Sequence, residues 1–230
     1  QGIGHYVFPR FTRAIDTFES RSDINQAFSL ISKSIDRNQM IISDVKHSIS
    51  DKKTPVILTR YKEHAKYLYD NLREEADHVF LIYGDNSDKE NSAARIEMKG
   101  IPDDESMILV ATGQKIGEGF DMPRLDTLML ASPVSSSGSN LEQYVGRLNR
   151  DYEGKKEVVV YDYVDSHIRY FNNMYSKRLN LYKKIGFSVI GWAAHEKQQA
   201  QAIYDAGNYS DTFEQDVIEA NKAIVISSPV

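Results

Sequence analysis

The stretch MILVATGQKIGEGFD, residues 107–121, decides the fold of this chain. Its first five residues are all apolar, which is typical of a strand buried on both faces of a parallel sheet. The strand leads into a loop with Gly113, Gly117 and Gly119, and glycines let a backbone turn sharply and approach a ligand closely. The spacing is not the G-x-G-x-x-G dinucleotide fingerprint, and a plain glycine loop would look the same. The stretch therefore predicts a buried strand followed by a candidate binding loop.

Four further apolar runs have the same character and alternate with helical patterns. The runs lie at residues 55–59, 79–83, 127–131 and 158–161. Apolar residues at helical spacing predict helices at 22–36, 40–49, 61–73, 86–99, 139–148 and 165–185. This alternation predicts an α/β fold, a parallel sheet with helices on both faces and a helical C-terminal extension. Ligands of such sheets bind at the carboxyl ends of the strands.

A second candidate site is the helix that begins at the capping box Ser139-Asn140-Leu141-Glu142. Arg147 and Arg150 are three residues apart near the end of this helix, so they are expected on one helix face. Two guanidinium groups that project together suit a triphosphate whose negative charge grows in the transition state. An ordinary surface ion pair is the alternative for either arginine.

The order and spacing of these elements resemble the second RecA-like domain of superfamily-2 helicases and translocases. Residues 108–121 resemble motif V of that family, and residues 143–150 resemble motif VI, Q-x-x-G-R-x-x-R. Residues 55–60, with the helix that follows them, resemble motif IV. The likeness covers residues 38–165 and is nearest to DEAD/DEAH-type helicases of bacterial restriction and defence systems. One departure is Tyr144, where many members of the family have a basic residue.

The resemblance implies a role for each matching residue. Arg147 and Arg150 would act as arginine fingers on the phosphates of ATP. The residues implied to contact the rest of the nucleotide are Gln143, Gly117, Gly119 and Asp121. The residues implied to hold the nucleic-acid backbone are Thr59, Arg60, Thr112 and Gly113. Contacts to phosphate and sugar predict binding that is independent of base sequence and weakened by salt.

The resemblance also implies ATP as the cofactor, with magnesium held mainly by another domain. The chain contains no G-x-x-x-x-G-K-[ST] phosphate loop, since Gly154-Lys155-Lys156 lacks the first glycine and the hydroxyl. The partner is therefore expected to be an upstream RecA-like domain of the same protein, and this chain alone is expected to hydrolyse no ATP. Asp162 follows an apolar run, but without a phosphate loop a structural role is favoured for it.

These assignments predict the domain organisation. Residues 1–37 are expected to connect to the upstream motor domain, and residues 38–165 to form the helicase C-terminal RecA-like domain. Residues 166–190 are expected to form a helix that packs on the motor, and residues 191–230 a linker and the start of a further domain. The first 20 residues have no clear hydrophobic period and are interrupted by Pro9, which favours a connector there.

Aromatic and basic residues are interleaved on the helix expected at 165–185. Tyr170, Tyr175 and Tyr182 lie among lysines and arginines, a pattern that can stack nucleic-acid bases, although packing on the sheet or on the upstream domain is the favoured interpretation. His64 lies beside motif IV and is expected to be an ordinary core or surface histidine. No metal site is expected, because none of the six histidines has a metal-binding spacing.

Composition narrows the class further. The absence of cysteine excludes disulfides and thiolate metal sites, and indicates a reducing, cytoplasmic setting. No apolar run approaches the roughly 18 residues of a membrane span, so no membrane partner is expected. The net charge of −5 argues against a protein coated in basic residues, yet residues 147–184 carry nine Lys or Arg against five acids. Such a stretch can hold phosphates, although a solvated helix face would have the same charge.

The sequence therefore predicts a C-terminal motor domain of an ATP-dependent helicase or translocase that acts on nucleic acid, with DNA favoured over RNA. The main alternative is a non-catalytic module that keeps the fold and binds nucleic acid or a protein. A phosphate loop in the upstream sequence would favour the motor, and its loss the module. A sugar-nucleotide transferase is a weaker alternative, because it gives no reason for Q-x-x-G-R-x-x-R.

Overall fold

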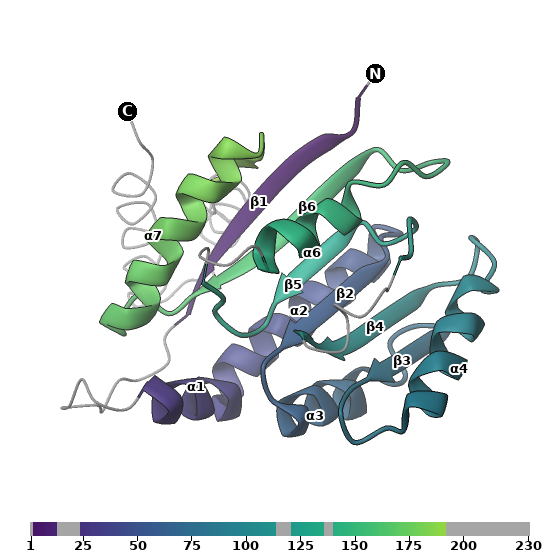
Figure 1. Ribbon diagram of the computed structural model, residues 1–230, viewed down its shortest axis with the longest axis horizontal. Helices are drawn as coiled ribbons and strands as arrows, with labels where there is room; N and C mark the ends of the chain where they lie inside the picture. The colour runs from purple at the N-terminus through teal and green to yellow at the C-terminus, as the bar shows by residue number, and fades with distance from the viewer. Residues whose placement is uncertain (1, 13–23, 114–120, 136–139, 192–230) are drawn as a thin grey trace, which may run out of the picture.

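A seven-stranded sheet forms the centre of the molecule (Figure 1). The computed structural model describes residues 2–12, 24–113, 121–135 and 140–191. The strand order is β3-β4-β2-β5-β6-β1-β7, and all neighbouring strands are parallel. The strands are β1 (Gly4–Phe11), β2 (Pro55–Thr59), β3 (His78–Ile82), β4 (Met107–Thr112), β5 (Thr127–Leu130), β6 (Glu157–Val164) and β7 (Ser188–Val189). The predicted parallel α/β fold is therefore confirmed.

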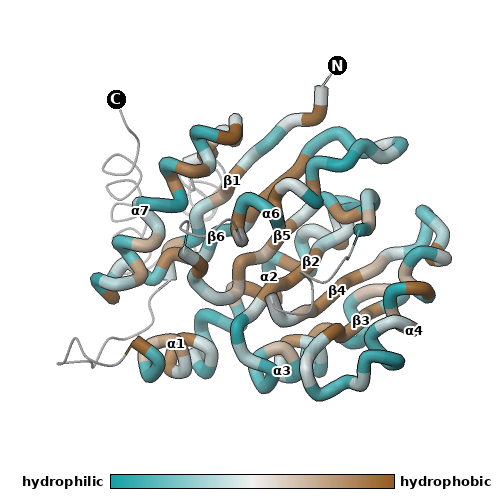
Figure 2. Tube along the Cα trace, in the orientation of Figure 1, coloured by the Kyte–Doolittle hydropathy of each residue, from teal (hydrophilic) through white to brown (hydrophobic). Residues whose placement is uncertain are grey.

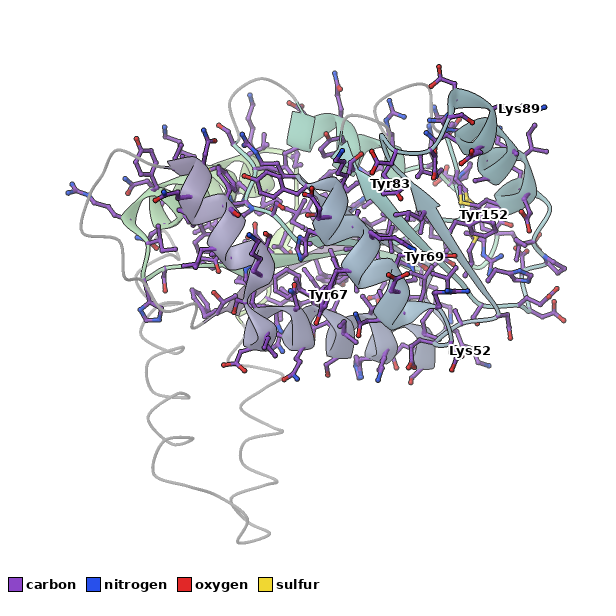
Figure 3. The ribbon with its side chains drawn as sticks, turned by 90° about the horizontal axis from the view of Figure 1, so that it is seen from below. Lys52, Tyr67, Tyr69, Tyr83, Lys89 and Tyr152 are labelled. Carbon is purple, nitrogen blue, oxygen red and sulfur yellow. The ribbon has the colours of Figure 1, made fainter. Side chains whose placement is uncertain are left out.

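Helices cover both faces of this sheet, as the sequence predicts. They are α1 (Ile24–Lys33), α2 (Ile35–Ser50), α3 (Lys62–Leu72), α4 (Asp88–Lys99), α6 (Asn140–Leu148) and α7 (Arg169–Lys184). Val45 of α2 and Leu68 of α3 pack in one apolar cluster, whereas Met98 of α4, Val145 of α6 and Tyr182 of α7 pack in another. Figures 1 and 3 show α2 and α3 together on one side of the sheet, with Tyr67 and Tyr69 labelled on α3.

The central strands are buried along their whole length. Every residue of β2 and β4 is buried, and these strands form a hydrophobic band through the middle of the molecule (Figure 2). Burial on both faces explains why the sequence shows continuous apolar runs there instead of an alternating pattern. Of the described helices, none is both long enough and apolar enough to cross a membrane.

Strand β1 is absent from the sequence prediction. It pairs with β6 over its whole length, and Pro9 lies within it. The N–H groups of the even-numbered Gly4 and Thr12 donate to Lys156, which precedes β6, and to Val164 at its end. The backbone nitrogen of the odd-numbered Pro9 therefore faces the other side, where β7 pairs only with Tyr6 and Val7. The missing N–H of Pro9 therefore costs no bond to β6. The segment expected to be a connector thus contains a strand of the sheet, whereas the role of residues 1–37 as a link to an upstream domain stays a prediction.

Helix α7 packs on the sheet through its aromatic residues. Tyr175 and Tyr182 are 3% and 0% exposed, whereas Tyr170 is 49% exposed. The interpretation as packing is therefore confirmed for the two buried tyrosines. The linker and further domain expected at 191–230 lie outside the described residues, apart from Gly191.

A buried ion pair fastens α7 to the sheet. The Arg178 guanidinium donates two hydrogen bonds of 2.8 Å to the two carboxylate oxygens of Asp162, and the two residues are 1% and 0% exposed. The Tyr182 hydroxyl donates a third bond to Asp162, at 2.6 Å. Asp162 therefore has the structural role that the sequence favours. Each charge is buried, so each depends on the other for its stability in the interior.

We expect Arg178→Met to lower the free energy of unfolding by about 3–5 kcal/mol, because it leaves the Asp162 carboxylate buried without its cation. Urea denaturation of the variant and the parent chain measures this loss. The control is Lys66→Ala, which breaks an exposed pair with Asp70 and is expected to leave the unfolding midpoint unchanged. A stability of Arg178→Met within about 1 kcal/mol of the parent would show that the pair does not hold α7.

Candidate nucleotide and nucleic-acid interface

The two loops predicted to hold nucleic acid begin side by side. Strands β2 and β4 are neighbours, and Thr59 lies opposite Thr112 in their parallel register. Arg60 and Gly113 follow directly at the carboxyl ends of these strands. The register therefore brings four predicted residues, distant in sequence, to one edge of the sheet.

These residues differ in how much they present to solvent. Arg60 is exposed, and its guanidinium carbon lies 4.4 Å from the ring centroid of Phe28 in α1. Thr59 is 3% exposed, and its hydroxyl bonds to His64 and Ser132 inside the protein. The Thr59 side chain therefore orients its neighbours, and Arg60 is the group that faces outward. Thr112 is 8% exposed.

Helix α6 is seated against the end of β4. Leu141, Val145 and Leu148 are buried, and this face holds the helix on the sheet. The Tyr144 hydroxyl donates a hydrogen bond of 3.1 Å to the backbone carbonyl of Gly113. Burial raises the pKa of Tyr144, so the hydroxyl is protonated and can donate. The predicted motif V and motif VI segments are thus in direct contact, and Tyr144, which appeared as a departure from the family, makes the contact.

A Cβ atom at position 113 would lie 2.9 Å from the Tyr144 hydroxyl oxygen. Contacts this short do not occur without a shift of one group, so glycine is what lets the tyrosine approach the backbone here.

The two predicted arginine fingers lie in different local structures. Arg147 is in the last turn of α6 and is partly exposed, whereas Arg150 lies two residues beyond the helix end at Leu148. The expectation that both arginines share one helix face is therefore wrong, because the helix ends before Arg150. Gln143 is exposed on α6.

An ion pair links Arg150, one of the predicted fingers, to Asp121. The Arg150 guanidinium lies 3.3 Å from Asp121, which directly follows the glycine loop, with side-chain exposures of 59% and 45%. Such exposed pairs are weak, so Arg150 can exchange this partner for another anion. Gly117 and Gly119 lie outside the described residues. Among the residues that are described, no group of three or more His, Asp or Glu is placed to hold a metal ion.

The ammonium group of Lys155 fixes the position of this arginine segment, a role that the sequence analysis missed. Its nitrogen lies 2.8–2.9 Å from the carbonyl oxygens of Pro123, Leu125 and Arg150 and also contacts that of Leu148, so its three N–H groups are shared among four acceptors. These carbonyls belong to the end of α6 and to the segment after Asp121. The lysine therefore joins the backbone of Arg150 to the segment two to four residues after Asp121, and no sequence motif signals it.

His64 is a neutral core histidine, in agreement with the sequence interpretation. It is 3% exposed, and its two ring nitrogens bond to Thr59 at 2.6 Å and to Asn38 at 2.7 Å. Burial, and to a smaller degree the positive charge of Arg37, lowers the pKa of His64 to about 3. The imidazole is therefore uncharged throughout the physiological range.

Solved structures define the class of fold. T4 UvsW superposes with a TM-score of 0.62 at 19% identity, covering 82% of this chain and 40% of that one. The C-terminal domain of the DEAD-box protein Dbp5 gives 0.51 at 14% identity, covering 82% of this chain and 90% of that domain. S. cerevisiae Dbp5 bound to RNA and ADP BeF3 gives a TM-score of 0.54 at 13% identity, covering 96% of this chain and 45% of that one. The fold is the RecA-like fold of helicase domains.

Sequence relatives are viral proteins. Uncharacterized protein 108L of Invertebrate iridescent virus 3 is 38% identical over 88 residues, which cover 38% of this chain and 79% of that protein. The chain therefore belongs to the same family as protein 108L, whose name assigns no activity. No protein-family model matches the chain.

Two longer relatives have names that describe a function. Putative helicase 161L of Invertebrate iridescent virus 6 is 30% identical over 159 residues, 65% of this chain and 34% of that protein. Transcript termination protein A18 of Myxoma virus (strain Lausanne) is 28% identical over 134 residues, which cover 56% of this chain and 27% of that protein. The chain thus matches about a third or less of each. The expected nearness to bacterial restriction-associated helicases stays a prediction.

The neutral state of His64 makes a pH-dependent contribution to stability. The unfolded chain takes up a proton on His64 below about pH 6.5, whereas the folded chain does so only near pH 3. Stability is therefore expected to fall as pH decreases between these values, by about 1.4 kcal/mol per pH unit from this residue. Urea unfolding at several pH values measures the slope, which is expected to be shallower in His64→Gln. A ring nitrogen signal in NMR that titrates near pH 6.5 in the folded chain would contradict this account.

Proposed function

We propose that this chain is the second motor domain of an ATP-dependent nucleic-acid helicase or translocase. The helicase-type fold supports this, and the contact between α6 and the end of β4 is the observation that carries it. That contact lies at the carboxyl edge of the sheet, where ligands of parallel sheets bind. At the other end of the α6 segment, an ion pair joins Arg150 to Asp121, the residue that follows the glycine loop.

The nucleotide side of the proposed site consists of Arg147, Arg150, Gln143 and Asp121. ATP and magnesium would be held mainly by the upstream RecA-like domain, and the arginines would reach the phosphates when the two domains close. Asp121 supports a nucleotide contact, because its carboxylate is 45% exposed and its ion pair with Arg150 is a weak surface pair. A carboxylate oxygen suits a ribose hydroxyl. Gly117 and Gly119 remain part of the proposal, although they lie outside the described residues.

The nucleic-acid side consists of Arg60, Thr112 and Gly113, with Thr59 contributing through its place at the strand end. An exposed guanidinium beside backbone N–H groups suits the sugar-phosphate backbone and reads no base sequence. The names of the relatives support a nucleic-acid substrate, since one is a putative helicase and another a transcript termination protein. The sequence analysis favours DNA, whereas the Dbp5 complex contains RNA, so the tests use both.

A non-catalytic binding module with the same fold is the second candidate. The local arrangement of Arg60 and Thr112 would serve such a module equally well. The two candidates differ in ATP hydrolysis by the full-length protein, which only the motor requires.

We expect Arg147→Ala in the full-length protein to lower nucleic-acid-stimulated ATP turnover about a thousandfold, because the phosphates lose a cation that acts in the transition state. Steady-state phosphate release, with single-stranded DNA or RNA as activator, measures the loss. The matched control is Arg73→Ala, which removes an exposed arginine at the end of α3 and is expected to leave turnover unchanged.

Parent-like turnover by Arg147→Ala would overturn the assignment of this arginine. A parent protein that binds nucleic acid but hydrolyses no ATP would favour the binding module. The 230-residue chain alone is expected to show no turnover in either case.

A further inference from the structure

A chain of buried hydrogen bonds begins at the backbone of Arg60. The Arg60 N–H donates to the Ser132 hydroxyl at 2.9 Å, and the Ser132 and Thr59 hydroxyl oxygens are 3.0 Å apart. The Thr59 oxygen lies 2.6 Å from Nδ1 of His64. Nε2 of His64 lies 2.7 Å from the side-chain oxygen of Asn38. The four side chains that make these bonds, those of Ser132, Thr59, His64 and Asn38, are all at most 6% exposed.

The donor and the acceptor of each bond in this hydrogen-bond chain can be assigned. The Asn38 side-chain nitrogen donates to the Ser32 carbonyl at 2.9 Å, so its oxygen must accept from His64. The neutral His64 ring therefore carries its proton on Nε2, and its Nδ1 accepts from Thr59. The Thr59 oxygen then accepts from Ser132, whose oxygen accepts from Arg60. Each group has one donor and one acceptor role, and bonds aligned in this way reinforce one another.

The hydrogen-bond chain ends on α1, the helix that also contacts the side chain of Arg60. Its far end is the carbonyl of Ser32 in α1, and Phe28 of the same helix lies under the Arg60 guanidinium at 4.4 Å. Arg60 is thus held at its backbone by the hydrogen-bond chain and at its guanidinium by α1. No carboxylate pairs with Arg60 among the described residues, so its charge is left for another anion.

We propose that His64, Thr59 and Ser132 are positioning residues, which hold Arg60 in the place where it contacts a phosphate of the bound nucleic acid. This rests on the proposed function and adds a specific device to it. A long arginine side chain loses conformational freedom when it binds, and a side chain already held in place loses less. The buried chain therefore raises affinity without touching the ligand.

The test is a double-mutant cycle on binding of the 230-residue chain to labelled oligo(dT) and oligo(U), measured by fluorescence anisotropy at several salt concentrations. Arg60→Ala is expected to weaken binding about tenfold and to lower the salt slope by about one. Ser132→Ala is expected to weaken binding about threefold in the parent, and to have no effect when Arg60 is already alanine.

Ser106→Ala is the matched control. Ser106 also accepts a backbone N–H, that of Asp77 at 2.8 Å, but it lies before β4, at the opposite edge of the sheet. The affinity of Ser106→Ala for both oligonucleotides is expected to equal that of the parent. Thr59→Val, which keeps the shape and removes the hydroxyl, replaces Ser132→Ala if the latter unfolds, as circular dichroism will show.

The outcomes separate the two proposals. Equal losses from Ser132→Ala with and without Arg60, or no loss at all, would overturn the positioning role. An affinity that Arg60→Ala leaves unchanged, or a parent chain that binds neither oligonucleotide, would overturn the proposed nucleic-acid site itself. Loss of the Ser132 effect in the Arg60→Ala background supports both.

Discussion

The parallel pairing of β2 with β4 is the constraint on which the rest of the structure depends. Both strands are buried on both faces, so a slip of one residue would move every side chain into the wrong layer. The register therefore places Thr59 opposite Thr112 without alternatives. Everything proposed for this edge of the sheet, from the outward-facing Arg60 to the seat of α6, follows from that alignment.

Buried polar contacts also fix the positions of the segments that follow the strands. Arg178 bonds to Asp162 and also to the carbonyl of Val134, so α7 holds the segment that leads toward α6. On the other face, Arg37 of α2 makes two bonds to Asp165, at 2.9 and 3.1 Å, just beyond the end of β6. Isolated buried charges would be very costly, and pairing converts them into specific links. The rim of the sheet is thus fixed by helices on both sides of it.

The sequence predicts the parts of this fold that have a strong local signal. The five apolar runs are strands in the structure, because burial on both faces demands continuous apolar sequence. Strand β1 has no such run, because most of its residues are only partly buried. Strand β7 has only two residues, too few to give a pattern. The partners of His64 and Tyr144 could not be predicted either. Asn38 is 26 positions from His64 and Gly113 is 31 from Tyr144, so only the folded chain brings them together.

The proposed ligand-facing surface consists of residues 59–61, 111–113 and 143–150, and it is expected to face a nucleotide and a nucleic acid. The decisive measurement is hydrogen–deuterium exchange of the full-length protein, with and without a non-hydrolysable ATP analogue and single-stranded DNA or RNA. We expect slower exchange in these three segments on ligand binding, and unchanged exchange at residues 101–106, which precede β4 at the opposite edge of the sheet. Protection confined to the opposite edge, or none in these segments, would contradict this expectation.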